Sequence, residues 1–294
     1  MAANTRDIRR RIKSVKNTSQ ITKAMQMVAA AKMRKAQSAA LAGRPYAALL
    51  NRVLQSVAVR SQDGGHPLLE ARDVAKHLVV VVSTDKGLCG ALNTNLLREA
   101  AKFDPAKTVF VAVGRRAMQW LVRNQRTVLA DFQLKDSMSF LDARMVSRFA
   151  MEKFLTGEVD KVSVLFTDFI NTLRQVPKEK VVLPISSLAV TVGVEGSIDD
   201  AVVDVKDGGL EYIFEPSQGE VLDAVLPHYV HFEVYQMILD SRASEHSARM
   251  VAMKSATDNA KQLIKDLTLE YNKIRQASIT TELLEITTAQ MALG

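Results

Sequence analysis

The chain has 294 residues, 47% apolar and 24% charged, a composition that indicates a folded protein and excludes a wholly disordered one. Its net charge of +7 indicates an anionic partner, without choosing among nucleic acid, a membrane surface and an acidic protein. The single cysteine, Cys89, excludes an internal disulfide and fits a reducing compartment. No run of about 18 apolar residues occurs, so no membrane-spanning segment is predicted.

The first predicted element is a long helix from Thr5 to about Val59. This length exceeds the roughly 8 to 20 residues of ordinary globular helices and favours a coiled coil. Gly43 and Pro45 fall inside it, and the proline is expected to kink or loosen the rod because it removes a backbone hydrogen bond. Apolar residues recur at steps of three and four, with a polar gap around Thr18: Ile8, Ile12, Val15, Ile21, Met25 and Val28.

This first arm is strongly basic. Between Met1 and Gln62 there are thirteen Lys or Arg residues and one acid, Asp7. Such a helix fits nucleic acid, an anionic membrane or an acidic protein loop, and it also fits a plain solvated face. Mitochondrial transit peptides are similarly rich in arginine and poor in acids, but here the apolar stripe continues past Ile21, which favours mature structure.

An α/β domain is predicted to follow the polar stretch from Asp63 to Arg72. The continuous β-branched run from His77 to Ser83 is typical of a strand buried on both faces. Strands and helices then alternate at the spacing of a mostly parallel, Rossmann-like sheet with helices on its faces. The segment from Gln175 to Ser186 is expected to add an edge hairpin, and Val192 to Gly209 reads as a loop region. The remaining strands are expected at Thr108–Val113, Thr127–Asp131 and Lys161–Asp168, and the helices at Ala91–Ala101, Arg115–Asn124 and Leu141–Phe154.

The turn from Ser83 to Asn93 (STDKGLCGALN) is the one candidate for a nucleotide site, because doubly wound folds bind phosphates at glycine-rich turns after a strand. It matches neither GxGxxG nor GxxxxGK[ST], since Gly90 is followed by alanine and leucine. A structural turn is the preferred interpretation. His228 and His231 are three residues apart but are read as surface histidines, and neither a metal ion, a cofactor nor a catalytic set is predicted.

The last predicted element is a second long helix, from about Gly219 to Ala292. Its apolar residues step by four, three, four and three, the spacing that keeps a seam facing a partner helix in a left-handed supercoil. The two helices are therefore expected to return alongside each other as an antiparallel coiled coil. The predicted division is a first arm at 1–60, an inserted α/β domain at 61–218 and a second arm at 219–294. The seam residues of the second arm are Ala260, Ile264, Leu267, Tyr271 and Ile274.

Several long motifs resemble those of one family, the gamma subunits of F-type ATP synthases. In the first arm they are ITKAMQMVAAAKMRK (Ile21–Lys35) and RPYA (Arg44–Ala47). In the second arm they are ARMVAMKSATDNA (Ala248–Ala260) and YNKIRQASITTELLEI (Tyr271–Ile286), and STDKGLCGALN is similar to the family's first strand and turn. The likeness extends over the whole chain and is weakest at Val192 to Gly209.

The resemblance implies a central rotor shaft that carries no catalytic site of its own. In the family, a coiled coil enters the head formed by the alpha and beta subunits. The α/β domain sits at the foot with the epsilon subunit on the membrane ring of c subunits. Ion flow turns the shaft and so drives ATP synthesis. In the reverse direction, ATP hydrolysis turns the shaft. The implied location is peripheral, on the cytoplasmic face of a bacterial inner membrane. Only Cys89 is present, so the regulatory cysteine pair of chloroplast relatives cannot form.

The resemblance also nominates site residues. Lys23 and Met25 match positions where the shaft passes an acidic loop of the catalytic subunit, and Tyr212 and Glu215 lie in LEYIFEP (Leu210–Pro216), which resembles the segment facing the membrane ring. Arginine suits such contacts because its guanidinium pairs with carboxylates in two places at once. The other positions implied in contact and coupling are Arg249, Arg275, Gln276, Thr280 and Glu282.

Two other classes of function stay open on the residues alone. A coiled-coil nucleic-acid binder would use the basic arm, and its binding would weaken steeply with salt; the arm has no aromatic residue to stack on bases before Tyr46. A small nucleotide-dependent enzyme would use the turn from Gly87 to Gly90, and it would require nucleotide binding by the isolated chain.

Overall fold

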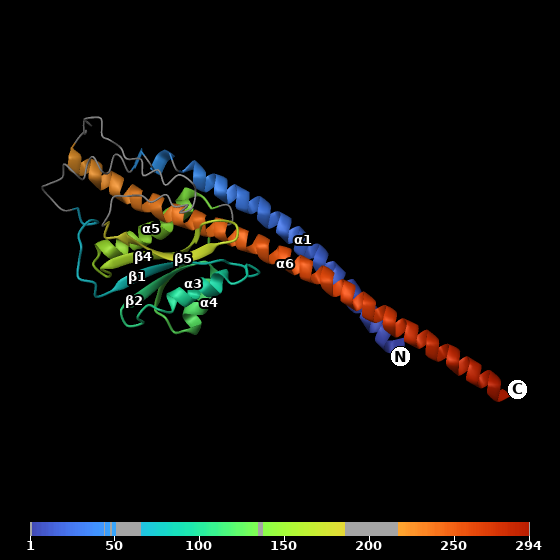
Figure 1. Ribbon diagram of the computed structural model, residues 1–294. Coiled ribbons are helices and arrows are strands. Elements are labelled where there is room, and N and C mark those ends of the chain that lie inside the picture. The colour runs from blue at the N-terminus through green and yellow to red at the C-terminus, as the bar shows by residue number, and fades with distance from the viewer. Residues whose placement is uncertain are drawn as a thin grey trace. The chain divides into compact units, whose positions relative to one another are not determined.

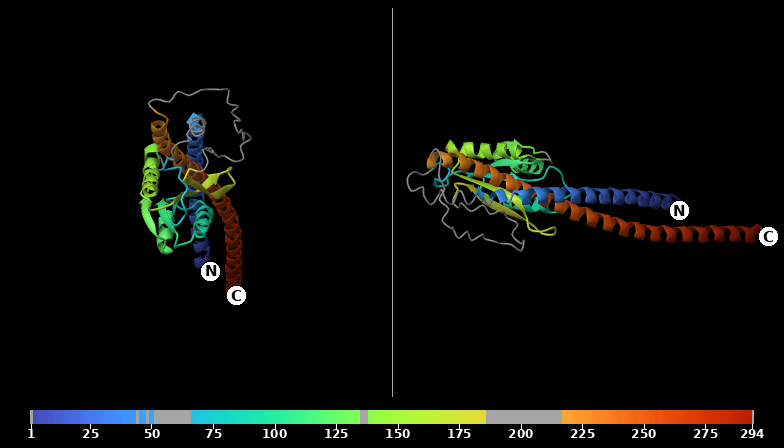
Figure 2. Two further views of the ribbon diagram at one scale, coloured as in Figure 1. Left: turned by 90° about the vertical axis from the view of Figure 1, so that its left-hand side faces the viewer. Right: turned by 90° about the horizontal axis from the view of Figure 1, so that it is seen from above.

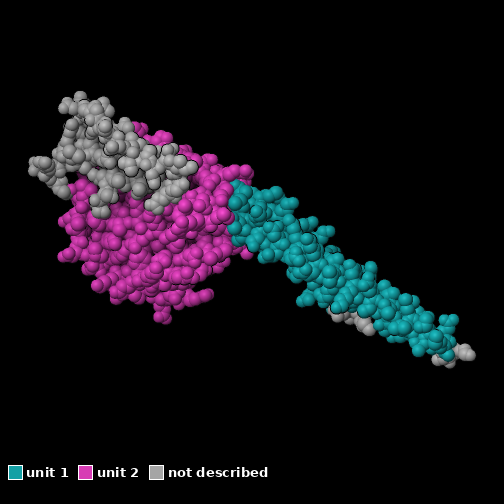
Figure 3. All heavy atoms as spheres, viewed as in Figure 1, with its two compact units in different colours: residues 1–30, 249–294 teal, residues 31–248 magenta. Residues whose placement is uncertain are grey.

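The computed structural model describes residues 2–43, 45–47, 49–50, 66–134, 138–185 and 217–293. The chain forms two compact units (Figure 3). Unit 1 combines Met1–Ala30 with Arg249–Gly294, and unit 2 is Ala31–Ala248. None of the helices in the described ranges is both long enough and apolar enough to cross a bilayer.

Two long helices begin and end the chain, as the sequence predicts. Helix α1 runs from Ala2 to Ala42 and helix α6 from Gln218 to Leu293. Within unit 1 they lie side by side with opposite directions, in both views (Figures 1 and 2). The helix is interrupted where the proline was expected to kink or loosen it, because α1 ends at Ala42 and helical residues resume at Pro45. The end of the first arm, predicted near Val59, lies outside the described residues.

Unit 2 contains a five-stranded sheet in the order β3-β2-β1-β4-β5. The first four strands are parallel to one another, and β5 pairs antiparallel with β4 at one edge. The predicted edge hairpin is therefore confirmed. The strands are β1 (His77–Val82), β2 (Thr108–Val113), β3 (Val128–Phe132), β4 (Lys161–Phe169) and β5 (Gln175–Leu183).

Helices cover both faces of the sheet, which explains its continuous apolar strands. Helices α3 (Leu92–Ala100) and α4 (Arg115–Arg123) pack on one face through Leu96, Leu121 and Phe110. Helix α5 (Phe140–Leu155) and the first part of α6 pack on the other face, in a larger core that contains Phe154 and Leu226. The arrangement is visible in Figure 1, where the strands lie between these helix pairs.

The part of α6 in unit 2 is unusually polar for a buried helix. Every residue from Tyr229 to Ser247 except Tyr235 is buried. A helix enclosed on all sides is normally apolar all round. Here the buried set includes polar and charged residues that need partners from other elements: His231, Glu233, Gln236, Asp240, Ser241, Arg242, Ser244, Glu245, His246 and Ser247.

Candidate functional site

The first candidate site is the shaft, the coiled coil of unit 1. On α6, the residues that are buried or half-buried recur at steps of four and three, and each predicted seam residue is among them. This spacing confirms the predicted heptad pattern of the second arm. The full seam of α6 is Met253, Thr257, Ala260, Ile264, Leu267, Tyr271, Ile274, Ser278 and Thr281.

The seam of α1 differs in part from the prediction. Ile8, Ile12 and Val15 face inward as expected, but Ile21 and Val28 are 60% and 56% exposed. Their predicted place in the seam is wrong. The polar gap around Thr18 is crossed by small and polar residues at the same heptad spacing, so the seam continues without a stop: Ser19, Thr22, Gln26 and Ala29.

Two contacts fix how the helices of the shaft pair. The hydroxyls of Thr22 and Thr257 lie 2.7 Å apart in the buried seam. The Arg9 guanidinium donates to the Tyr271 hydroxyl and also lies over its ring, with 5.4 Å between the guanidinium carbon and the ring centroid. A single buried polar pair favours one register of a coiled coil, because every other alignment loses the hydrogen bond between the two hydroxyls.

Replacing both Thr22 and Thr257 with valine is expected to leave shaft stability nearly unchanged. Each hydroxyl also has an acceptor in its own helix, the carbonyls of Ser19 and Met253. In the single variant Thr257→Val, the Thr22 hydroxyl therefore keeps one partner, and the free energy of unfolding should fall by only about 1 kcal/mol. Thermal unfolding followed by circular dichroism at 222 nm measures both. A double variant less stable than the single one would show that the threonine pair contributes more than its own hydrogen bond.

The outer surface of the shaft is basic along α1. Lys23 is exposed there, as are the arginines and lysines of the first turns: Arg6, Arg9, Arg10, Arg11, Lys13 and Lys16. The acid at Asp7 is already engaged by Arg10 at 2.9 Å. The surface is therefore suited to an acidic partner rather than to another cation.

The last turns of α6 extend past the coiled coil. Seven residues of α1 precede Arg9, whereas α6 continues for 22 residues beyond its partner Tyr271. Leu283, Leu284 and Met291 are exposed on this free end. Exposed apolar side chains grouped in this way indicate a surface made for a partner.

The predicted contact residues fall on the outside of the shaft or at the seam margin. Lys23, Arg275, Gln276, Thr280 and Glu282 are exposed on their helices. Met25 and Arg249 are half-buried, each in its own helix. The residues predicted for the foot, Tyr212 and Glu215, lie outside the described residues.

The glycine-rich turn after β1 is held together by its own side chains. The Asn93 side chain donates to the Thr84 hydroxyl at 2.8 Å and to the Cys89 sulfur at 3.3 Å, and the Thr84 hydroxyl donates to the Lys86 carbonyl at 2.7 Å. Thr84 and Cys89 are buried. These contacts account for the sequence of the turn by a structural role, which agrees with the preferred interpretation.

Helix α6 occupies the place where doubly wound sheets bind ligands. That place is the carboxyl edge between β1 and β4, where the strand order reverses. Here the Ser244 hydroxyl donates to the Thr167 carbonyl at 3.1 Å, and the Ser241 hydroxyl approaches the Val82 carbonyl at 3.5 Å. Because the chain's own helix lies there, this arrangement argues against the alternative that the chain is a nucleotide-dependent enzyme.

Sequence patterns did not reveal the buried ion pair of Glu233. Its carboxylate lies 2.5 Å from the Lys180 ammonium and accepts from the Tyr229 hydroxyl at 3.3 Å. Burial, and then the charge and hydrogen bond of Glu233, raise the pKa of the Tyr229 hydroxyl. Lys180 comes from the edge strand β5, so the pair ties that strand to α6. The sequence offers no periodic signal for this pair, because its two members lie far apart in the chain.

The interpretation of His231 as a surface residue is wrong. His231 is buried and its Nδ1 lies 2.7 Å from the Ser147 hydroxyl. Burial and the nearby cations lower the pKa of His231 to about 4. His228 is half-buried between the rings of Tyr46 and Phe140. Within the described ranges, no three side chains of the types that bind metals gather closely enough to hold an ion.

Together, the two units define a class of protein in which an antiparallel coiled coil carries an α/β domain inserted between its helices. The family model described as ATP synthase matches residues 4–293. The chain is 50% identical to the ATP synthase gamma chain of Methylacidiphilum infernorum (isolate V4), over 99% of this chain and 100% of that one. It is 48% identical to the gamma chain of Opitutus terrae, over 99% of both.

Solved structures share the fold. The rotor of the Euglena gracilis mitochondrial ATP synthase aligns with a TM-score of 0.62 at 21% identity, covering 95% of this chain and 100% of that chain. A chain from the OSCP/F1/c-ring structure of the same enzyme aligns with a TM-score of 0.67 at 22% identity, covering 100% and 95%. The chain belongs to the ATP synthase gamma chain family, which confirms the resemblance of its motifs.

Proposed function

We propose that the chain is the central rotor shaft of a bacterial F-type ATP synthase and that it transmits torque between an ion-driven membrane ring and a catalytic head. The observation that carries this proposal is the unbroken seam between α1 and α6, in a chain 50% identical to a gamma chain over its whole length. A rod that carries torque needs continuous packing, because a gap would let the helices slip.

The proposed partners follow the surfaces of the chain. Unit 1 inserts into the alpha and beta subunits, with the basic face of α1 opposite acidic loops and the apolar end of α6 in an apolar sleeve. The foot contacts the epsilon subunit and the c ring. In the proposed division, residues 1–60 and 219–294 are the shaft and residues 61–218 are the foot.

Coupling is proposed to depend on the residues nominated by the family motifs. Lys23, Arg275 and Gln276 lie on the outer faces of their helices and are accessible to a catalytic subunit. Exposed ion pairs contribute about 0–1 kcal/mol each, so coupling would be spread over many contacts. The other residues of this set are Met25, Arg249, Thr280 and Glu282, and Tyr212 and Glu215 are proposed for the membrane-ring contact.

The chain is proposed to have no active site. The glycine-rich turn and the carboxyl edge of the sheet are both filled by internal contacts, which leaves catalysis to other subunits. Its place would be peripheral, on the cytoplasmic face of the inner membrane.

Reconstitution with alpha and beta subunits tests the proposal. A bead should be attached through an added cysteine at Leu173, which is 81% exposed, because Cys89 is buried. Rotation driven by ATP with three evenly spaced stops is the expected result. ATP hydrolysis by the chain alone, without assembly, would refute the rotor and return attention to the glycine-rich turn.

Replacing Met25 with lysine is expected to reduce coupled ATP synthesis several-fold while assembly stays normal. Met25 lies on the basic arm, and an added ammonium would form a surplus ionic contact with an acidic loop that must release during rotation. Proton-driven synthesis in vesicles measures the effect, and Met25→Leu is the matched uncharged control. Equal synthesis in both variants would count against an acidic loop at this position.

A further inference from the structure

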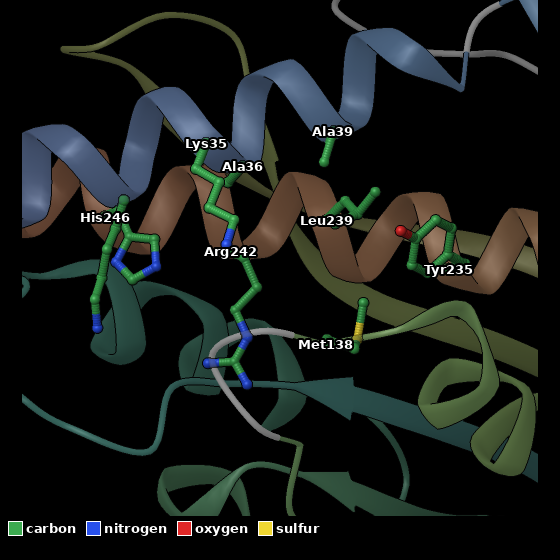
Figure 4. A pocket seen from close by; sticks show the side chains of 9 residues that line it. Lys35, Ala36, Ala39, Met138, Tyr235, Leu239, Arg242 and His246 are labelled. Carbon is green, nitrogen blue, oxygen red and sulfur yellow. The ribbon is translucent and has the colours of Figure 1, made fainter.

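Unit 2 contains a cavity of about 280 Å³ that the proposed rotor function does not use. Its size is at the lower end of the roughly 300–1,000 Å³ typical of small-molecule sites. Its walls are one face of α1 and one face of α6, with Met138 ahead of α5 between them (Figure 4). The cavity is open to solvent on the α1 side, where Lys32, Lys35 and Ala39 are exposed. All of its lining residues belong to unit 2.

The cavity has an apolar body. Ala36 and Ala39 line it from α1, and Leu239 lines it from α6, opposite Met138. The alanines leave the space open because they have no side chain beyond Cβ. An aliphatic or aromatic group of a few carbons would therefore find apolar contacts on both sides.

The lining carries three cations, Lys32 and Lys35 from α1 and Arg242 from α6, together with His246. None of the described lining residues is acidic. Arg242 and His246 are only 7% and 4% exposed. A concave site with cations, and no carboxylate among its described lining residues, favours an anion.

Lys35 is the cation best placed for a ligand. Arg242 already donates to the Leu134 carbonyl at 2.8 Å and pairs with Glu245 at 3.1 Å, so its charge is largely committed. By contrast, Lys35 is exposed, and its ammonium has no hydrogen-bond or ion-pair partner in the part of the chain that the structure describes. Its side chain points from α1 toward α6 (Figure 4).

We propose that this cavity binds a small amphiphilic carboxylate. The carboxylate would accept from the Lys35 ammonium, and the apolar chain would lie between Ala39 and Leu239. Inorganic phosphate fits less well, because a compact, strongly hydrated anion would lose its water against walls that are mostly apolar. A ligand held by α1 and α6 at once would hold the two helices together within unit 2, an effector role that goes beyond torque transmission.

The test uses octanoate as the probe and the methyl signal of Met138 as the reporter. The full chain is labelled with ¹³C at its methionine methyl groups, and Met138→Leu assigns the signal. Octanoate should shift this signal saturably, with a Kd on the order of 1 mM, as expected for a ligand of this size. Octanol lacks the charge and acetate lacks the chain, so each should bind about tenfold more weakly or not at all.

Matched variants separate the site from general attraction to a basic helix. Lys35→Gln should weaken octanoate about tenfold, whereas Arg34→Gln, one residue away on α1 and outside the cavity, should leave the Kd unchanged. Ala39→Phe should fill the cavity and abolish the shift. Equal losses in Lys35→Gln and Arg34→Gln, or an unmoved Met138 signal, would overturn the proposal. Because the assay needs no other subunit, its result is independent of the rotor test.

Discussion

Replacing Glu233 with alanine is expected to lower the free energy of unfolding of unit 2 by about 3 kcal/mol. The Glu233 side chain is 5% exposed, and its carboxylate has two partners, the Lys180 ammonium at 2.5 Å and the Tyr229 hydroxyl at 3.3 Å. Without it, the lysine, which is only 23% exposed, keeps a charge that water solvates poorly. Denaturant unfolding followed by circular dichroism measures the loss.

Two further variants show whether the loss comes from the charge that remains buried on Lys180. The double change of Glu233→Leu with Lys180→Met is expected to recover most of the stability, because it removes both charges and fills the same space. Lys261→Ala breaks an exposed pair with Asp258 and should cost less than about 0.5 kcal/mol. If the double variant were as unstable as Glu233→Ala, the loss would come from packing and not from charge.

The second large effect is expected from acid. Burial lowers the pKa of His77 to about 4, with a further decrease from Lys161 and an opposing increase from Glu179. Burial lowers the pKa of His231 to about 4 as well, and Arg144, His228 and Arg148 act in the same direction. In the unfolded chain both residues would titrate at about 6.5.

The sign of the effect follows from these values. Between pH 6.5 and about 4 the unfolded chain binds more protons than the folded one, so stability falls as the pH falls through this range. Each histidine would contribute a loss of about 3 kcal/mol across the range. Denaturant unfolding at a series of pH values measures the slope.

The variants His77→Gln and His231→Asn should flatten this slope. Glutamine places a nitrogen near the Nε2 of His77, which lies 2.8 Å from the Ser163 hydroxyl, and asparagine does the same for the Nδ1 of His231 beside Ser147. Neither replacement binds a proton in this range. An unchanged slope in the double variant would assign the acid sensitivity to carboxylates.

The sheet could be predicted closely because its signals are local. The run from Leu78 to Val82 is apolar throughout, and helices on both faces require that pattern. The heptad from Ala260 to Ile274 was equally clear, since each seam position is apolar or aromatic. Where a pattern of apolar residues depends only on the burial of one helix or strand, the sequence is sufficient to predict that element.

The remaining features depend on partners distant in the chain. Thr22 belongs to the seam because Thr257 faces it, while Ile21 is more apolar but points outward. Glu233 tolerates burial because Lys180 arrives from another strand, and His231 because Ser147 arrives from α5. Apolar periodicity does not detect such pairs, since each member taken alone resembles a surface residue.

The handedness of the shaft has a mechanical consequence. A seam with a strict seven-residue repeat winds two helices to the left, like the strands of a left-laid rope. Twisting such a coiled coil in one sense adds supercoil turns and presses the helices together, whereas twisting it in the other sense removes turns and separates the helices. Tightly packed side chains resist compression more than separation. Unit 1 should therefore be a stiffer torsion spring in one sense of rotation than in the other, so forward and reverse strokes would store different amounts of elastic energy.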